Sequence, residues 1–199
     1  FFIGIEDLNI YAINPFQPIK EIYKKAMMSN TPNLFIENKL DYNFIPKNIS
    51  KNIYDGFEVV HSNIIDDFSV SFSITSFKDE IGTLICYGGM LRYCLSAVKK
   101  LYLEHEISCR VLCLGKISPL NFSSLKLLAS KSGFILTVEE NTAEFGLGSE
   151  ICYNFFYDKK YTDICKIGSI TSLIPSSPTL EELVLINENN IYNKLLSFL

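Results

Sequence analysis

The sequence predicts an α/β fold of three layers with a mainly parallel β-sheet. Short apolar runs typical of strands alternate along the chain with segments whose apolar residues recur at helical spacing. Several of the strand-like runs are apolar throughout, which is typical of parallel strands covered by helices on both faces. Strands that alternate with helices in this way are the pattern of an α/β domain.

The first 45 residues predict a strand, a helix and a second strand. Residues 9–13 are rich in strand-forming side chains, and Pro15 and Pro18 then open a helix, where proline is tolerated in the first turn. Residues 34–36 form the second apolar run. We treat residues 1–45 as one unit and the polar residues 46–68 as a linker that holds one short strand near 57–60.

The remaining residues, 69–199, predict a second domain with a regular alternation of strands and helices. A serine followed by proline, Ser118-Pro119, favours a helix start there, and Gly133 favours its end. The predicted strands are residues 69–76, 82–87, 108–114, 134–138 and 163–167. The predicted helices are residues 90–105, 118–133, 147–157 and 192–199.

The composition excludes two classes of partner. Of the 199 residues, 48% are hydrophobic and 20% are charged, and the net charge is −4. This negative charge removes the electrostatic argument for a nucleic-acid-binding protein. No apolar run approaches the ~18 residues that span a bilayer. We therefore expect neither nucleic acid nor a membrane as a partner.

The six cysteines predict packing thiols and not disulfides or a metal centre. No two of them have the two-residue gap of a zinc ribbon, and the chain has only two histidines. The cysteines lie among apolar residues, where a free thiol behaves as a small hydrophobic group. Reduced thiols favour a reducing compartment, and we expect a cytoplasmic protein.

The best local signal for a site follows the strand at 134–138. Glu139 and Glu140 come at its carboxyl end, where open α/β sheets place functional loops, and Glu144 and Gly146 follow. Consecutive strand side chains point to opposite faces, so the first two do not form an acid–base pair. Two interpretations stay open: a functional loop, or acidic residues that are solvated or cap the next helix.

Five segments, in order, resemble one family. Residues 82–90, 108–120 and 137–150 are similar to the carboxy-terminal domain of the transketolase superfamily. Residues 175–185 resemble the tail of the β subunits of 2-oxoacid dehydrogenases, such as pyruvate dehydrogenase. Residues 5–45, through the runs 7–15 and 30–42, resemble the end of the thiamine-binding pyrimidine domain of the same subunits. The resemblance implies a transketolase C-terminal-like domain at 69–199, preceded by a partial pyrimidine domain that ends at residue 45.

The resemblance implies an oxidoreductase. The complete enzyme would use thiamine diphosphate for the oxidative decarboxylation of a 2-oxoacid, with acyl transfer to a lipoyl group. The family's catalytic glutamate and histidine match positions upstream of Phe1, so no catalytic residue is assigned here. These residues alone are expected to be inactive, to hold no thiamine diphosphate by themselves and to serve subunit assembly.

The resemblance also implies a structural potassium ion and several partners. The ion would be bound by backbone carbonyls of Ala26, Met27, Ser29 and Thr31. The expected partners are a second copy, through the C-terminal domain, an α-type subunit and a lipoyl acyltransferase core. The last helix supports the homodimer, since it has more apolar positions than one core-facing stripe needs: Ile191, Leu195, Leu196, Phe198 and Leu199. The alternative is that this helix packs wholly on its own sheet.

Two other functions stay open at this stage. One is a transketolase or deoxyxylulose-phosphate-synthase-like enzyme that acts on sugar phosphates. It would need basic residues at the cofactor cleft, for which Arg110 and Lys116 are the candidates. The other is a degenerate module that kept the fold and lost catalysis.

Overall fold

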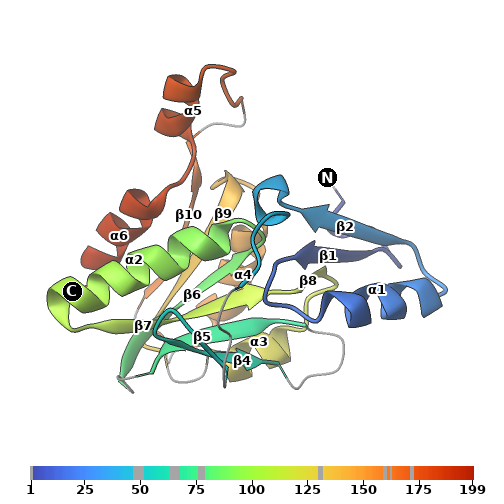
Figure 1. Ribbon diagram of the computed structural model, residues 1–199, viewed down its shortest axis with the longest axis horizontal. Coiled ribbons are helices and arrows are strands. Elements are labelled where there is room, and N and C mark those ends of the chain that lie inside the picture. The colour runs from blue at the N-terminus through green and yellow to red at the C-terminus, as the bar shows by residue number, and fades with distance from the viewer. Residues whose placement is uncertain are drawn as a thin grey trace.

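The chain folds around two β-sheets, seen in the computed structural model of Figure 1. One sheet has three strands and the other has seven among the described residues. The structure describes residues 2–46, 52–62, 68–75, 79–129, 132–158, 161, 163–170 and 173–199.

The small sheet is built mainly by the first unit of the chain. β1 (Asn9–Ile13) pairs in parallel with β2 (Asn33–Glu37), and α1 (Ile19–Met28) connects them, as the sequence predicts. A short 3₁₀ helix, η1 (Lys39–Asp41), follows β2. The third strand, β8 (Lys116–Ser118), comes from much later in the chain and pairs antiparallel with β1. The small sheet therefore joins the two halves of the chain.

The large sheet is mainly parallel, which confirms the predicted fold class. Its order is β10-β9-β6-β7-β5-β4-β3. The pairs β10–β9, β9–β6 and β6–β7 are parallel, and the three strands beyond β7 are antiparallel. The bounds are β3 (Ile53–Tyr54), β4 (Phe57–His61), β5 (Val70–Ile74), β6 (Glu80–Tyr87), β7 (Ser108–Leu114), β9 (Phe134–Thr142) and β10 (Asp163–Ser169).

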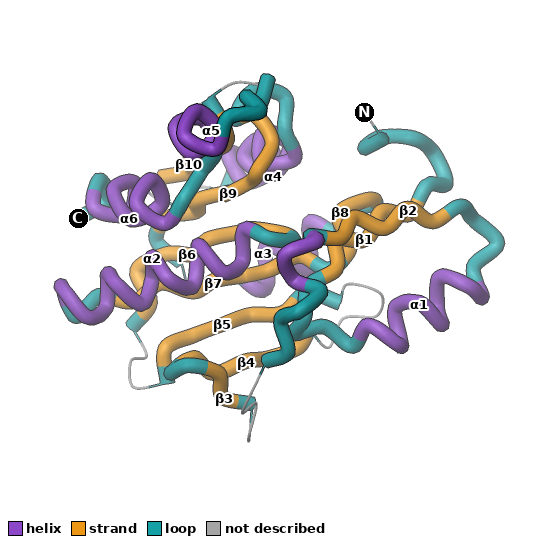
Figure 2. The backbone as a smooth tube through the Cα atoms, turned by 45° about the horizontal axis from the view of Figure 1, so that its top comes forward, coloured by secondary structure: helices purple, strands orange, loops and turns teal. Residues whose placement is uncertain are grey.

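Helices cover both faces of this sheet and complete three layers. On one face lie α2 (Met90–His105) and α6 (Glu188–Leu196), which run side by side in Figures 1 and 2. On the other face lie α3 (Phe122–Leu128) and α4 (Leu147–Phe156). Side chains of β6 alternate between two cores: Leu84 and Cys86 pack under α2, and Ile85 packs under α4. This alternation is the two-residue period of a strand.

The second core also holds the small sheet in place. Ile10 and Ala12 of β1 belong to the same buried cluster as Leu112 and Leu114 of β7. Burial of such side chains is the main stabilising term of a fold. The first unit is therefore packed onto the large sheet and is not an independent appendage.

Two local predictions differ from the structure. The predicted linker at 46–68 contributes β3 and β4 to the large sheet, while its residues 47–51 and 63–67 lie outside the described residues. The helix predicted to start at Ser118-Pro119 starts at Phe122 instead, because Ser118 pairs with β1 as the end of β8. Asn121 is the N-cap, and its side-chain oxygen accepts a bond from the Ser124 backbone N–H at 3.0 Å.

The carboxy-terminal region has one helix more than the sequence predicted. α5 (Pro178–Val184) has no buried residue and stands apart from the rest of the molecule beyond β10 in Figure 1. The last helix, α6, begins at Glu188 and not at residue 192, because Asn187 and Asn190 form a capping box there. No helix within the described ranges is both long and apolar enough to cross a lipid bilayer.

The cysteine environments lead to a first prediction. We expect Cys152 and Cys165, which are half-buried, to react with iodoacetamide well before the four buried cysteines. The reactive form is the thiolate, and burial raises the pKa of the Cys109 thiol to about 12. Mass spectrometry of the native protein during labelling will count the modified thiols. Six thiols labelled at one rate, or a mass deficit of two hydrogens per cysteine pair, would contradict this prediction.

Candidate functional site

A groove of about 920 Å³ lies at the carboxyl ends of β6 and β9. The chain runs from β6 to β7 on one side and returns to β9 on the other, so the strand order reverses between β6 and β9. Open α/β sheets bind ligands at such a reversal. The groove is lined by the N-terminal segment 3–9 and, among others, by Tyr87, Pro119, Asn141, Phe145 and Gly146.

Glu139 lies beside this groove, but its carboxylate is turned into the protein. The side chain is only 1% exposed. Its two oxygens accept bonds from the backbone N–H groups of Leu147 at 3.1 Å and Gly148 at 3.0 Å, and the Tyr87 hydroxyl donates a third at 3.3 Å. These amides belong to the first turn of α4, where N–H groups lack partners within the helix. Glu139 therefore holds the start of α4, which is the capping interpretation of the motif.

Gly146 lets this carboxylate approach the helix. A Cβ atom at Gly146 would lie 2.2–2.4 Å from the carboxylate atoms of Glu139, and one at Gly148 would lie 2.8 Å from a carboxylate oxygen. The other two predicted site residues, Glu140 and Glu144, are exposed and do not join this cluster. Of the four residues, the structure brings together Glu139 and Gly146.

The electrostatics of the cluster follow from its burial. Burial raises the pKa of Glu139, and the bonds from Gly148, Tyr87 and Leu147 offset this only in part. Burial and the nearby charge of Glu139 also raise the pKa of the Tyr87 hydroxyl. Because both oxygens of Glu139 face the amides of α4, the carboxylate is not directed at the groove as a general base.

The two basic candidates are held elsewhere. Arg110 forms an ion pair with Glu80 at 2.8 Å and donates to the backbone carbonyl of Leu128 at 2.9 Å. Glu80 is at the amino end of β6, opposite to the groove. Lys116 is on β8 with its ammonium 5.8 Å from the ring centre of Tyr11. Neither lines the groove, which removes the support for a sugar-phosphate site.

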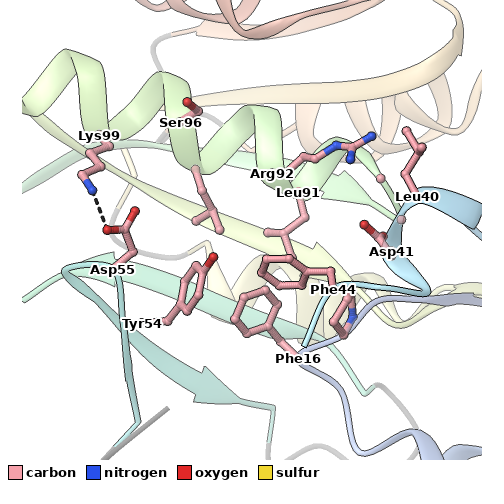
Figure 3. A pocket seen from close by; sticks show the side chains of 14 residues that line it. Phe16, Leu40, Asp41, Phe44, Tyr54, Asp55, Leu91, Arg92, Ser96 and Lys99 are labelled. Carbon is pink, nitrogen blue, oxygen red and sulfur yellow. Dashed lines mark hydrogen bonds and ion pairs between the residues drawn. The ribbon is translucent and has the colours of Figure 1, made fainter. Parts of the chain in front are cut away.

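Sequence reasoning missed a second cavity, of about 370 Å³, between η1, β3 and α2 (Figure 3). Its floor is aromatic: the ring of Phe16 lies 4.7 Å from that of Tyr54 and 6.0 Å from that of Phe44, between ring centres. At one end are Asp41 and Arg92, and burial raises the pKa of Asp41. No local motif signals this cavity, because its walls come from four separate segments.

The family of the chain is decided by its sequence match. Residues 78–191 match the family model of the transketolase, C-terminal domain. The chain belongs to this family.

Known proteins that are similar to this chain are β subunits of 2-oxoacid dehydrogenases. The chain is 26% identical to the pyruvate dehydrogenase E1 component subunit beta of Cyanidium caldarium, over 100% of this chain and 57% of that protein. It is 23% identical to the mitochondrial subunit beta-1 of Arabidopsis thaliana, over 93% of this chain and 49% of that protein. It is 26% identical to the 2-oxoisovalerate dehydrogenase subunit beta of Bacillus subtilis, over 86% of this chain and 50% of that protein. The resemblance to pyruvate dehydrogenase β subunits is confirmed.

A solved structure supports the fold. A split-gene transketolase, described as an inactive β4 tetramer, superposes with a TM-score of 0.67 at 19% identity. The match covers 98% of this chain and 58% of that chain. The chain spans about half the length of the curated relatives it matches.

Of the residues expected to hold potassium, Ala26 and Met27 lie in the last turn of α1, and Ser29 and Thr31 lie between α1 and β2. The backbone carbonyls of Ala26 and Thr31 already accept hydrogen bonds from the side-chain amide of Asn33, at 3.0 and 2.8 Å. Met27 is mostly exposed. The Ala26 carbonyl also accepts the backbone N–H of Ser29 at 3.1 Å, and the Thr31 carbonyl also accepts the Ser29 hydroxyl at 3.4 Å, so both lone pairs of each oxygen already have donors. The residues of this transketolase-family chain therefore do not fit the ion that the resemblance implies.

A prediction follows for Glu139. We expect E139Q to lower the free energy of unfolding by about 1–3 kcal/mol, because the Gln amide replaces one acceptor oxygen with a donor and leaves a buried N–H without a partner. E140Q, the same change at the exposed neighbouring residue, is the matched control. Chemical denaturation of the three proteins measures the difference.

The difference in stability between the wild type and E139Q should change with pH in one direction. The raised pKa of Glu139 means that the folded state binds the proton more tightly than the unfolded state. Its contribution to stability is present below the unfolded pKa and is lost as the pH rises through the folded pKa. The advantage of the wild type over E139Q should therefore shrink with rising pH. Equal stability of E139Q and E140Q would contradict the capping role, and an advantage that grows with pH would contradict the raised pKa of Glu139.

Proposed function

We propose that this chain is part of a β-type subunit of a thiamine-diphosphate-dependent 2-oxoacid dehydrogenase and that this portion serves subunit assembly. In the complete enzyme the subunit would take part in oxidative decarboxylation of a 2-oxoacid, with acyl transfer to a lipoyl group. The similarity to pyruvate and 2-oxoisovalerate dehydrogenase β subunits, from three different organisms, supports this proposal.

The use of Glu139 argues against a catalytic role for this carboxylate. This buried carboxylate at the carboxyl edge of the sheet accepts bonds from the amides of α4 and stabilises the fold. Within the described parts of the chain, no group of three or more His, Cys, Asp or Glu side chains is arranged to hold a metal ion. We propose that this portion does not hold thiamine diphosphate by itself.

We propose that the homodimer contact lies in an exposed arm and not in the last helix. This arm comprises residues 170 and 173–184 and includes α5. In α6, Ile191 and Leu195 are fully buried in the chain's own core, and the ring of Phe198 stacks on Phe134 at 4.1 Å. Leu196 also packs against this core, so of the five apolar positions that favoured the last helix as an interface only Leu199 is exposed. The apolar side chains of the arm that are half exposed or more are Ile170, Leu173, Ile174, Leu180 and Leu183.

An arm of this kind has the properties of an assembly element. Large apolar side chains gathered on one exposed segment mark interaction sites, and obligate interfaces bury roughly 2,000 Å² or more. We propose that this arm contacts a second copy of the chain. An α-type subunit and a lipoyl acyltransferase core are the further partners we propose for the complete enzyme. A cytoplasmic location stays a prediction, since the Arabidopsis relative is mitochondrial by name.

Light scattering tests the homodimer. At tens of micromolar we expect a mass of twice 22.6 kDa for the wild type. The double variant L180K/L183K should shift the protein to the monomer mass, because two buried charges at an interface are strongly unfavourable. L127K, a charge placed on the equally exposed side chain of Leu127 in α3, is the control and should remain a dimer. A monomeric wild type would contradict the assembly role.

Calorimetry tests whether this chain binds the cofactor by itself. Titration of this chain with thiamine diphosphate and Mg²⁺ should give no binding, because the Glu139 carboxylate is already occupied by the α4 amides and is not directed at the groove. A dissociation constant in the micromolar range would contradict the proposal that this portion does not hold the cofactor.

A further inference from the structure

We propose that the side-chain amide of Asn33 takes the place that the family resemblance assigns to a potassium ion. The turn between α1 and β2 would then be closed by hydrogen bonds and would not depend on a monovalent cation. This inference concerns the stability of the turn and does not rest on the proposed enzymatic activity.

The amide nitrogen of Asn33 bridges two of the four carbonyls that the ion would use. It donates to the carbonyl of Ala26 at 3.0 Å and to that of Thr31 at 2.8 Å. Ala26 lies in the last turn of α1, where carbonyls lack partners within the helix, and it also accepts the backbone N–H of Ser29 at 3.1 Å. An amide NH₂ has two hydrogens, one for each carbonyl. Asn33 therefore makes the link between helix and strand that a cation would otherwise make.

A surrounding network sets the orientation of this amide. Asn9 donates to the side-chain oxygen of Asn33 at 3.2 Å and to the hydroxyl of Thr31 at 2.7 Å. The hydroxyls of Ser29 and Thr31 are 2.7 Å apart. If the Asn33 amide were turned over, its oxygen would face two carbonyls and its NH₂ would face the NH₂ of Asn9. Both contacts would be repulsive, so the bridging orientation is favoured.

The charges beside the network also disfavour a cation. A neighbouring groove of about 500 Å³ is lined by Asn9 and Ser29 of the network, by Lys24, Lys25 and Lys116, and by one carboxylate, Glu21. Three ammonium groups against one carboxylate leave this groove positively charged, and burial, followed by the charge of Lys25, lowers the pKa of Lys116. A potassium ion would add a further positive charge to this region.

The test compares thermal unfolding of the chain in potassium, sodium and choline chloride at equal ionic strength. We expect the wild type to have the same Tm in all three salts. N33D replaces the donor amide with a carboxylate, so the two carbonyls and the new carboxylate face one another and create an acceptor set for a cation. This variant should have a lower Tm in choline chloride and regain several degrees in potassium chloride. N30D, the same change at exposed Asn30 in the same turn, should show no such salt dependence.

Two results would overturn the inference. A wild-type Tm that is several degrees higher in potassium than in choline chloride would show that an ion is held despite Asn33. A salt response of N33D equal to that of N30D would show that Asn33 does not occupy the cation position. If N33D does not fold, N33S, which removes the bridging amide without adding charge, replaces it. Its Tm should fall below that of the wild type by more in choline than in potassium chloride, and an equal fall in the two salts would overturn the inference.

Discussion

Burial of β6 on both faces is the constraint on which the rest of this structure depends. The strand pairs in parallel with β7 on one side and β9 on the other, and Leu84, Ile85 and Cys86 are almost completely buried. A strand of this kind requires a helical layer on each face. The chain meets the requirement by placing α2 and α6 over one face and α3 and α4 over the other. The reversal of strand order that results leaves the groove between β6 and β9.

Several helix ends in this fold are satisfied by polar side chains. Glu139 accepts from the first amides of α4, and Asn33 donates to a last carbonyl of α1. Asn121 and Asn187 cap α3 and α6 from their own N-cap positions. A buried polar group without a partner is costly, so these bonds are structural requirements. They also explain why the most conspicuous polar motif at the sheet edge stabilises a helix and is not directed at a ligand.

What the fold leaves uncovered fits an assembly role. The arm formed by residues 170 and 173–184 carries exposed apolar side chains, two of them on α5, which has no buried residue, while α6 turns Ile191 and Leu195 into the core. The groove is bordered by the N-terminal segment 3–9, and Phe145 at its rim is 97% exposed. These surfaces belong to a chain that spans about half of its relatives, so they suit contacts with further protein, which is what we propose for a β-type subunit.

The sequence by itself determined the class of fold, the order of most elements and the family. These depend on local periodicity and on short motifs, which a single chain displays in full. It failed where partners are distant: β8 pairs with β1 from more than a hundred residues away, so Ser118 ends a strand and does not cap a helix. The direction of the Glu139 carboxylate, the bridge made by Asn33 and the inward face of α6 were likewise decided by tertiary packing. Each depends on which group lies nearby in the folded protein, and the spacing of residues along the chain does not predict contacts between distant segments.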